Sequence, residues 1–489
     1  MSAKASPGGY YAALREVLLN DPDRVVVWRR DQPITAGAFL QGAANMAGWL
    51  AGCGHAAGDR LGLALHDNLH TIQMTLACWM LDAEPMILDH RLTREDLPAW
   101  QQRYKLRGVI SGQARLADLP GIRLFPGPAQ LPQTPLPPLP VGSPADRRAD
   151  FITSSGVSGP PKVGAHTQAS MLAAVRDMIE DERRGVWGAA LSVISVAFGG
   201  ARYFWWRNLL AGVPVHVMDL LFSIEALDAA LLDPRIEDCT LPPNLIRALA
   251  DHAEKMGATT QRYPHIRKLQ SIGGPARAED KLRAYHLLTT GYVMTYSSTE
   301  TGLLTRIEGA DLLAHPDSCG RILPGLEVQI VDAEDRPCGV GTVGRIRLHR
   351  AGKPGEEASY AYPGDLGWFD AAGFLYIAAR GEGIICRNGE NFSAAVLEAR
   401  LLDLPWLRDV AVIRVPGRDD NDDAILLALD AGETPVAQIR RQLRQRLIAR
   451  EYPTGIWMLK PEDYTAGGKI QRQRIAATWS TAPERFLPF

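Results

Sequence analysis

Ten residues in the first third of the chain have the types and spacing of a phosphate-binding loop. The segment runs from Thr153 to Lys162 and reads T-S-S-G-V-S-G-P-P-K. Its glycines let the backbone approach a ligand closely, its hydroxyls and N–H groups donate hydrogen bonds to oxyanions, and its lysine adds a positive charge. The spacing differs from the common nucleotide loop G-x-x-x-x-G-K-[ST], because two prolines precede Lys162 and Val163 follows it. A flexible surface turn is the alternative interpretation.

Two more polar segments follow predicted strands. Leu269 to Pro275 reads as a strand that runs into a glycine turn, and Gly291 to Tyr296 as a strand that ends in the polar segment Ser297 to Gly302. Small and polar residues at the ends of neighbouring strands favour a ligand crevice in an open α/β sheet. For Ser297 to Gly302 alone, a capped helix start is the alternative, since Ser-x-x-Glu patterns also begin helices.

The elements that must position these segments alternate between helix and strand. Apolar residues recur at helical spacing in Tyr10 to Leu19, Thr35 to Leu50 and Leu69 to Leu81, and short strand-like runs separate them. Ala149 to Ile152 reads as a strand and Ser170 to Glu180 as a helix, so the phosphate loop is predicted to connect a strand to a helix. This order predicts an α/β fold built in layers.

The pattern changes twice after Gly325. Short strands from Glu327 to Ile377 predict a small β subdomain, and helices and strands from Ala394 onward predict a small α+β domain. We therefore predict a large N-terminal domain of layered α/β subdomains plus the β subdomain, residues 1–381, and a small C-terminal domain, residues 382–489.

Bulk composition excludes several classes of protein. At 489 residues the chain is too long for one compact core, so two or more domains are expected. Lys and Arg number 53 against 55 Asp and Glu, and a net charge of -2 offers no general attraction to nucleic acid or to an anionic membrane. Six scattered cysteines without a C-x-x-C pair argue against a disulfide framework or a zinc site and fit a reducing compartment. Without a signal peptide or an uninterrupted apolar span, we expect a cytoplasmic protein with no membrane span.

Five separated motifs occur in the order of one known family. They are Ser155 to Lys162, similar to S-G-[ST]-[ST]-G-x-P-K; Tyr296 to Glu300, similar to Y-G-x-T-E; Pro363 to Asp365, similar to T-G-D; Arg380, at the place of a ribose-site arginine; and Thr465 to Arg472, similar to T-x-x-G-K-[IL]-x-R. The chain departs from these motifs at Val157, Val163 and Ser297. On these residues it resembles the acyl-adenylate-forming superfamily, which includes acyl- and aryl-CoA synthetases, stand-alone adenylation domains and luciferases.

The resemblance implies an AMP-forming acid–thiol ligase that uses ATP and Mg²⁺. The implied catalytic residues are Lys469, Thr299 and Glu300, and Glu300 is also the implied metal ligand. The implied ATP- and AMP-binding residues are Thr153, Ser154, Ser155, Gly156, Ser158, Gly159, Lys162, Tyr296, Ser298, Asp365 and Arg380. In these roles Tyr296 lies against adenine, Asp365 accepts both ribose hydroxyls, and Lys469 contacts the substrate carboxylate and the α-phosphate.

A second half-reaction is implied as well. The small C-terminal domain is expected to be mobile, to swing about a hinge at Glu382, and to bring the segment around Gly389 into a thiol channel. No carrier-protein serine motif follows Lys469. The thiol is therefore expected from outside, most simply coenzyme A, with the phosphopantetheine of a separate carrier protein as the alternative.

The acid itself is constrained by one position. Amino-acid-activating relatives place aspartate after the phenylalanine of F-D-x-S, and here the pair aligns with Phe198 and Gly199. An α-ammonium would be left buried without its partner, at a cost of about 3–5 kcal/mol. We therefore expect an aryl acid or a short to medium acyl chain, in a pocket of Phe198, Gly199, Tyr203, Ser271, Gly273, Gly274, Val293 and Thr295.

Two other interpretations remain open. Val157, Val163 and Ser297 allow a degenerate family member that binds a nucleotide or acyl ligand without turnover. Near the C-terminus a helix with an apolar stripe carries a basic face, Arg440, Arg441, Arg444 and Arg446. Such a face is usually solvated, and binding of phosphate or a partner is its alternative role.

Overall fold

The computed structural model describes most of the chain: residues 9–89, 94, 96–139, 146–153, 163–182, 188–274, 276–298, 301–332, 334–350, 359–380, 384–387, 390–417, 423–448, 451–465 and 468–489. Within these ranges no helix combines the length and the apolar character that crossing a bilayer requires. The cysteine side chains described there, Cys53, Cys78, Cys239, Cys319 and Cys338, are free thiols.

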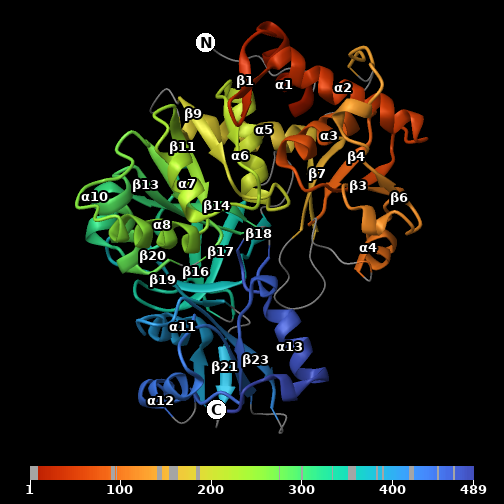
Figure 1. Cartoon of the computed structure of the whole chain (residues 1–489). Helices are drawn as coiled ribbons and strands as arrows, with labels where there is room; N and C mark the ends of the chain where they lie inside the picture. The colour runs from red at the N-terminus through yellow and green to blue at the C-terminus, as the bar shows by residue number, and fades with distance from the viewer. Residues whose placement is uncertain are drawn as a thin grey trace.

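A sheet of 14 strands organises the larger part of the molecule (Figure 1). Its order is β16-β17-β19-β20-β15-β14-β13-β12-β11-β9-β10-β1-β2, with β18 paired to β17. The strands from β13 to β1 in this order are parallel, and β2 and the strands from β14 to β16 are antiparallel. The strands are β1 (Val25–Arg29), β2 (Gln32–Thr35), β9 (Ala189–Ser192), β10 (Val215–Val217), β11 (Ile236–Leu241), β12 (Lys268–Ser271), β13 (Tyr292–Ser298), β14 (Gly302–Glu308), β15 (Gly320–Ile322), β16 (Glu327–Val331), β17 (Gly344–Arg350), β18 (Ser359–Ala361), β19 (Asp365–Phe369) and β20 (Phe374–Arg380).

Both faces of the parallel strands are buried. On β9, Ala189 and Leu191 belong to one core cluster while Ala190 belongs to another, as the alternation of side chains along a strand requires. One face is covered by α1 (Tyr10–Asn20), α5 (Gln168–Glu182) and α6 (Gly199–Ala211); the other by α7 (Ile224–Leu231), α8 (Pro243–Lys255), a π-helical turn at Ala284–Leu288 and α10 (Gly309–Ala314), with the short α9 (Ala278–Arg283) beside α8. The predicted layered α/β fold is thereby confirmed.

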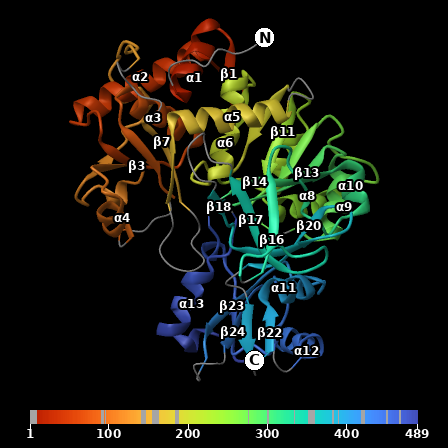
Figure 2. The ribbon, with the colours of Figure 1, turned by 180° about the vertical axis from the view of Figure 1, so that it is seen from behind.

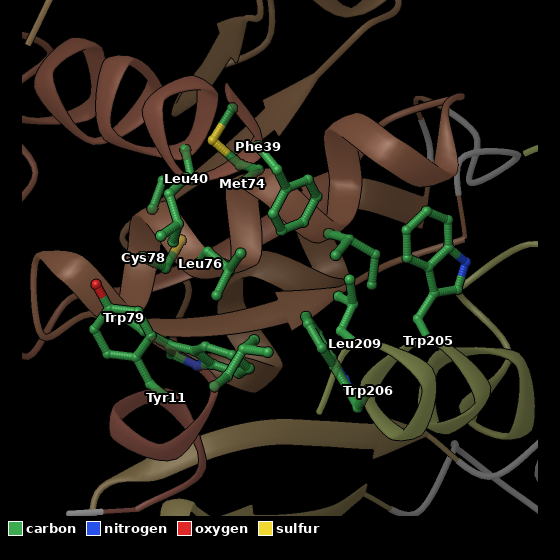
Figure 3. Packing of buried hydrophobic residues seen from close by; sticks show 14 of the residues in the cluster. Tyr11, Phe39, Leu40, Met74, Leu76, Cys78, Trp79, Trp205, Trp206 and Leu209 are labelled. Carbon is green, nitrogen blue, oxygen red and sulfur yellow. The ribbon is translucent and has the colours of Figure 1, made fainter. Parts of the chain in front are cut away.

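The aromatic run of α6, Tyr203 to Trp206, lies in or against the larger core. Trp206 packs 5.1 Å from Trp79 between ring centroids, and the indole N–H of Trp205 donates to the hydroxyl of Ser192 at 2.8 Å. Figure 3 shows Trp205 and Trp206 facing Phe39, Leu76 and their neighbours. This packing fixes α6 between the large sheet and the N-terminal helices.

A second, fully parallel sheet stands beside this core. Its order is β4-β3-β5-β6. Its elements are β3 (Arg60–Ala64), β4 (Glu84–Ile87), β5 (Gly108–Ser111) and β6 (Ile122–Leu124), with α2 (Ala36–Gly52), α3 (Asn68–Met80), α4 (Asp96–Tyr104) and 3-10 turns at Ala114–Leu116 and Pro128–Gln130.

The predicted connection from strand to helix around the phosphate loop is wrong in one respect. A strand, β8 (Val163–Thr167), follows the loop and pairs antiparallel with β7 (Arg148–Thr153) before α5 begins. The register sets Thr153 opposite Val163, so residues 154–162 join the two arms of a hairpin. Five residues with one glycine and mixed polarity carry too weak a pattern to reveal such a strand, which is stabilised by its partner.

The strands expected as a small β subdomain are present, and they continue the large sheet through β15 rather than forming a sheet of their own. They keep a separate small core of Leu304, Ile330, Ile346, Leu348 and Leu375. The predicted strand pattern is confirmed. The joining of these strands to the large sheet depends on tertiary packing, which the local pattern does not report.

Residues from 384 onward form what we call the C-terminal unit, which both views show below the rest of the molecule (Figures 1 and 2). A three-stranded sheet, β23-β24-β25, lies between two core clusters. The elements are β21 (Ile384–Arg387), β22 (Glu390–Ser393), α11 (Ala394–Leu402), β23 (Asp409–Pro416), β24 (Asp423–Asp430), α12 (Val436–Arg446), β25 (Gly455–Met458) and α13 (Arg472–Thr481), with 3-10 turns at Pro461–Asp463 and Pro483–Arg485.

Candidate active site

Four parallel strands end at the same edge of the large sheet. The carboxyl ends of β9, β11, β12 and β13 lead into Phe198, Pro242, Gly273 and Ser298 respectively, and neighbouring parallel strands present these ends side by side. Open α/β sheets bind ligands at this edge. The polar strand ends singled out in the sequence therefore meet there.

Lys469 reaches this edge from the C-terminal unit. Its ammonium nitrogen lies 5.6 Å from the centroid of the Phe198 ring, within the range of a cation–π interaction. Gly273, with φ +92°, forms the turn beneath both side chains. A Cβ atom at Gly273 would lie 3.2 Å from Cζ of Phe198 and 3.7 Å from Cε of Lys469. The turn thus needs glycine both for its backbone conformation and for the close approach of the lysine.

The loop that carries Lys469 is held by its own hydrogen bonds. The amide of Lys469 donates to the hydroxyl of Thr465 at 3.1 Å, and the amide of Thr465 donates to the carbonyl of Lys469 at 2.7 Å. On the other side of the loop, a Cβ atom at Gly468 would lie 3.3 Å from Oδ1 of Asn244, at the start of α8. The lysine is therefore presented by a short closed loop seated on α8.

Apolar side chains pack against the two glycines that follow Phe198. A Cβ atom at Gly199 would lie 3.0 Å from Cγ2 of Ile152, and one at Gly200 would lie 3.1 Å from Cδ1 of Ile272. Gly199 has no room for the aspartate of amino-acid-activating relatives unless Ile152 moves. This wall suits an uncharged acyl or aryl group.

Arg202 ties this wall to the sheet. Its buried guanidinium forms an ion pair with Asp150 on β7 and donates to the carbonyls of Val196 at 2.9 Å and Phe151 at 3.2 Å. A buried charge needs such a set of partners. Arg202 thereby fixes the segment before Phe198 against the strand that carries Ile152.

Tyr296 and Asp365 come together although they are far apart in sequence. The hydroxyl of Tyr296 donates to Oδ2 of Asp365 at 2.5 Å, and the carboxylate of Asp365 is buried. The register of β19 and β20 sets Arg380 directly opposite Asp365. The two predicted ribose residues are therefore cross-strand neighbours, next to the tyrosine predicted to contact adenine.

Ser298 is the last residue of β13 and is paired with Gly302, the first residue of β14. The amide of Thr301 donates to its hydroxyl at 3.1 Å, and the hydroxyls of Ser298 and Thr301 lie 2.9 Å apart. Since β14 follows directly, the alternative of a helix start at Ser297 to Gly302 is wrong.

The remaining pocket residues divide into two groups. Ser271, Val293 and Thr295 are buried on β12 and β13, where Gln270 donates to the hydroxyl of Thr295 at 2.9 Å, and Gly274 lies against Pro243. Tyr203 instead packs toward the β7–β8 hairpin, with its ring 5.9 Å from that of His166. Burial and the neighbouring Asp150 carboxylate raise the pKa of the Tyr203 hydroxyl.

Several predicted site residues lie outside the described residues: Ser154, Ser155, Gly156, Ser158, Gly159, Lys162, Thr299, Glu300, Glu382 and Gly389. Thr153 and Arg380 are described in their backbone alone. Across the described ranges, no group of three or more His, Cys, Asp or Glu side chains is arranged to hold a metal ion. The implied magnesium ligand, Glu300, is not among those residues.

The structure adds residues that the sequence did not single out. Ile152 and Ile272 pack against Gly199 and Gly200, Arg202 holds the segment before Phe198, and Asn244 lies against Gly468 in the lysine loop. An apolar residue at a strand end is too common to carry a signal. Asn244 follows Leu-Pro-Pro, and proline at the start of a helix is the one hint available.

Comparison with known proteins gives a consistent result. A family model described as AMP-binding enzyme matches residues 14–352. The 2-succinylbenzoate–CoA ligase of Listeria monocytogenes serotype 4b (strain F2365) is 24% identical over 443 residues, covering 88% of this chain and 91% of that relative.

Solved structures share the fold. The amide bond synthetase McbA from Marinactinospora thermotolerans superposes with a TM-score of 0.77 at 20% identity, covering 96% of this chain and 99% of that one. The o-succinylbenzoate CoA synthetase MenE from Bacillus subtilis, in complex with the acyl-adenylate OSB-AMP, superposes with a TM-score of 0.75 at 17% identity, covering 95% and 97%.

Proposed function

The chain belongs to the family of AMP-binding enzymes, and from that premise we propose that it activates a carboxylic acid with ATP and transfers the acyl group to a thiol, most simply that of coenzyme A. The observation that carries the proposal is the position of Lys469, whose ammonium reaches the crevice beside Phe198 and Gly273 from a separate part of the chain. Curated relatives named as CoA ligases match over nearly the whole chain, which supports the same activity.

In the first half-reaction a carboxylate oxygen of the acid attacks the α-phosphorus of ATP, and the bond to pyrophosphate breaks. The described residues have distinct tasks in this step. Tyr296 and Asp365 receive the adenosine, with the carboxylate accepting the ribose hydroxyls. Lys469 neutralises the negative charge that gathers between the carboxylate and the α-phosphate. Catalysis is mainly positioning and charge neutralisation.

In the second half-reaction the thiol sulfur attacks the acyl carbonyl, and AMP leaves. We propose that the C-terminal unit swings about Glu382 for this step, that residues around Gly389 line the path of the thiol, and that Glu300 holds magnesium in the first step. The phosphate loop from Thr153 to Lys162 and Thr299 would hold the phosphates. We also propose that the N-terminal domain ends at residue 381 and the C-terminal domain begins at residue 382. The protein is further proposed to act in the cytoplasm.

The acid is proposed to be an aryl acid or a short to medium acyl chain. Ile152, Phe198 and Ile272 make the near wall of the crevice apolar, and Gly199 leaves an α-ammonium without a partner. The names of the curated relatives suggest including 2-succinylbenzoate in any panel.

The test is acid-dependent release of pyrophosphate with ATP and Mg²⁺, over aryl, fatty and amino acids. Products are identified by mass spectrometry with and without coenzyme A. A CoA thioester of an aryl or acyl acid is the expected result. An adenylate that persists in the presence of coenzyme A would favour a carrier protein as acceptor, and nucleotide binding without release for any acid would favour the degenerate binder.

A further inference from the structure

The C-terminal unit meets the N-terminal part at a set of polar contacts around the turn of Gly273. Arg277 follows this turn in the chain and donates from its guanidinium to the carbonyl of Leu402, at 2.6 Å. Leu402 is the last residue of α11. The carbonyls at a helix C-terminus lack partners within the helix and carry partial negative charge, so a cation there is favourable.

Asp280, which also lies in the N-terminal part, fixes the orientation of the Arg277 side chain. Asp280 accepts from Nε of Arg277 at 2.8 Å and from a terminal nitrogen at 3.1 Å. Such a two-point pair fixes the plane of the guanidinium and leaves its remaining N–H groups directed outward. The N-terminal part thus orients the guanidinium of Arg277 independently of the C-terminal unit.

A second contact lies at the lysine loop itself. Gly468 packs against Asn244 and Pro242 at the start of α8, where a Cβ atom on the glycine would lie 3.3 Å from Oδ1 of Asn244 and 3.6 Å from Cβ of Pro242. The hydrogen bond of Arg277 and this packing both join the C-terminal unit to the N-terminal part.

We propose that Arg277 is a positioning residue that docks the C-terminal unit in the orientation that places Lys469 in the crevice. The inference rests on the proposed two-step reaction. Adenylate formation then depends on Arg277, whereas transfer to the thiol, for which the unit turns away, does not. The contact with Leu402 is polar and only partly buried, so breaking it exchanges a hydrogen bond with water at modest cost, as a unit that must undock in every cycle requires.

The test compares the two half-reactions in Arg277→Met, which keeps the apolar stem and removes the charge. A charged hydrogen bond of this kind shifts an equilibrium by roughly tenfold or more. We expect the rate of acid-dependent pyrophosphate release to fall about tenfold in this variant. The rate of thioester formation from preformed acyl-adenylate and coenzyme A should stay unchanged or rise. Arg277→Lys, which keeps one donor, should recover part of the first rate.

Arg262→Met is the matched control. Arg262 makes a two-point pair with Asp228, like that of Arg277 with Asp280, and both residues lie in the N-terminal part, so its loss removes a comparable ion pair without touching Arg277, Asp280 or Leu402. Melting temperatures of all variants are measured alongside. Equal losses in both half-reactions, or the same selective loss in Arg262→Met, would overturn the proposal.

A readout without substrate separates this proposal from the proposed function. Hydrogen–deuterium exchange of the peptide spanning residues 460–475 is followed in the wild type and the variants, with and without ATP. Docking shields this peptide, so its exchange should be faster in Arg277→Met and unchanged in Arg262→Met. If no acid releases pyrophosphate in the wild type, the proposed function fails while the exchange still decides whether Arg277 docks the unit. Unchanged exchange in Arg277→Met refutes the docking role.

Discussion

Replacing Lys469 by methionine removes one charge from the crevice while keeping a side chain of similar length. The ammonium lies 5.6 Å from the Phe198 ring, and the Cε atom fits over the turn at Gly273, so methionine can occupy the same space. The change therefore isolates the role of the charge from the role of packing.

The size of the effect follows from the position of the ammonium. Two unit charges about 4 Å apart attract by about 4 kcal/mol at an effective dielectric constant of about 20. Lys469 is half-buried, so solvent screens part of this interaction. A loss of about 3 kcal/mol, or a rate reduction between about 10² and 10³, is expected for adenylate formation.

The assay measures both half-reactions on the same variant. Acid-dependent pyrophosphate release reports the first, and thioester formation from preformed acyl-adenylate and coenzyme A reports the second. We expect Lys469→Met to reduce the first rate by at least about 10² and the second by less than about threefold. Lys460→Met, which changes an exposed lysine of the same unit, is the control.

The reasoning is refuted if Lys469→Met slows the two half-reactions equally, because the charge would then act on a feature common to both. It is also refuted if pyrophosphate release is as fast as in Lys460→Met. A lower affinity for ATP at an unchanged maximal rate would assign Lys469 to ground-state binding instead.

Three further predictions concern other residues of the site and its support. Asp365→Asn should raise the KM for ATP about ten- to hundredfold in ATP–pyrophosphate exchange and leave the KM for the acid unchanged. The reason is that the variant loses the charged group proposed to accept the ribose hydroxyls, which also accepts from Tyr296. An unchanged KM for ATP would contradict this role. Gly273→Ala, at φ +92° and with a new Cβ 3.2 Å from Phe198, should lower the free energy of unfolding by about 1–2 kcal/mol and raise the KM for the acid roughly tenfold, measured by thermal unfolding and pyrophosphate release. Asp409→Asn should raise the melting temperature at pH 8 but not at pH 4. Burial raises the pKa of Asp409 to about 6, with Arg247, Glu398 and Asp430 also acting on it. The folded state thus binds the proton on Asp409 more tightly than the unfolded state does. The stability that this proton contributes is present below about pH 4 and is lost as the pH rises through 6, at a cost of up to about 3 kcal/mol.

Local patterns were sufficient for most elements of the fold. The helices predicted at Thr35 to Leu50 and Leu69 to Leu81 are observed at Ala36–Gly52 and Asn68–Met80, and the strand predicted from Leu269 is observed at Lys268–Ser271. Periodicity reports which face of a segment is buried, and that property belongs to the segment itself. The lysine motif near the C-terminus was equally recognisable, because its glycines and lysine are adjacent in the chain.

Only the tertiary structure decided which distant segments meet. β8 forms because β7 lies beside it, and the strands after Gly325 extend the large sheet because β15 offers them an edge. The bond between Tyr296 and Asp365, the ammonium of Lys469 beside Phe198, and the contact of Arg277 with Leu402 each join residues from different elements. No local pattern encodes such pairs, since a side chain's partner depends on how whole elements pack. The sequence by itself thus determined the elements and the chemistry available, and packing determined where that chemistry converges.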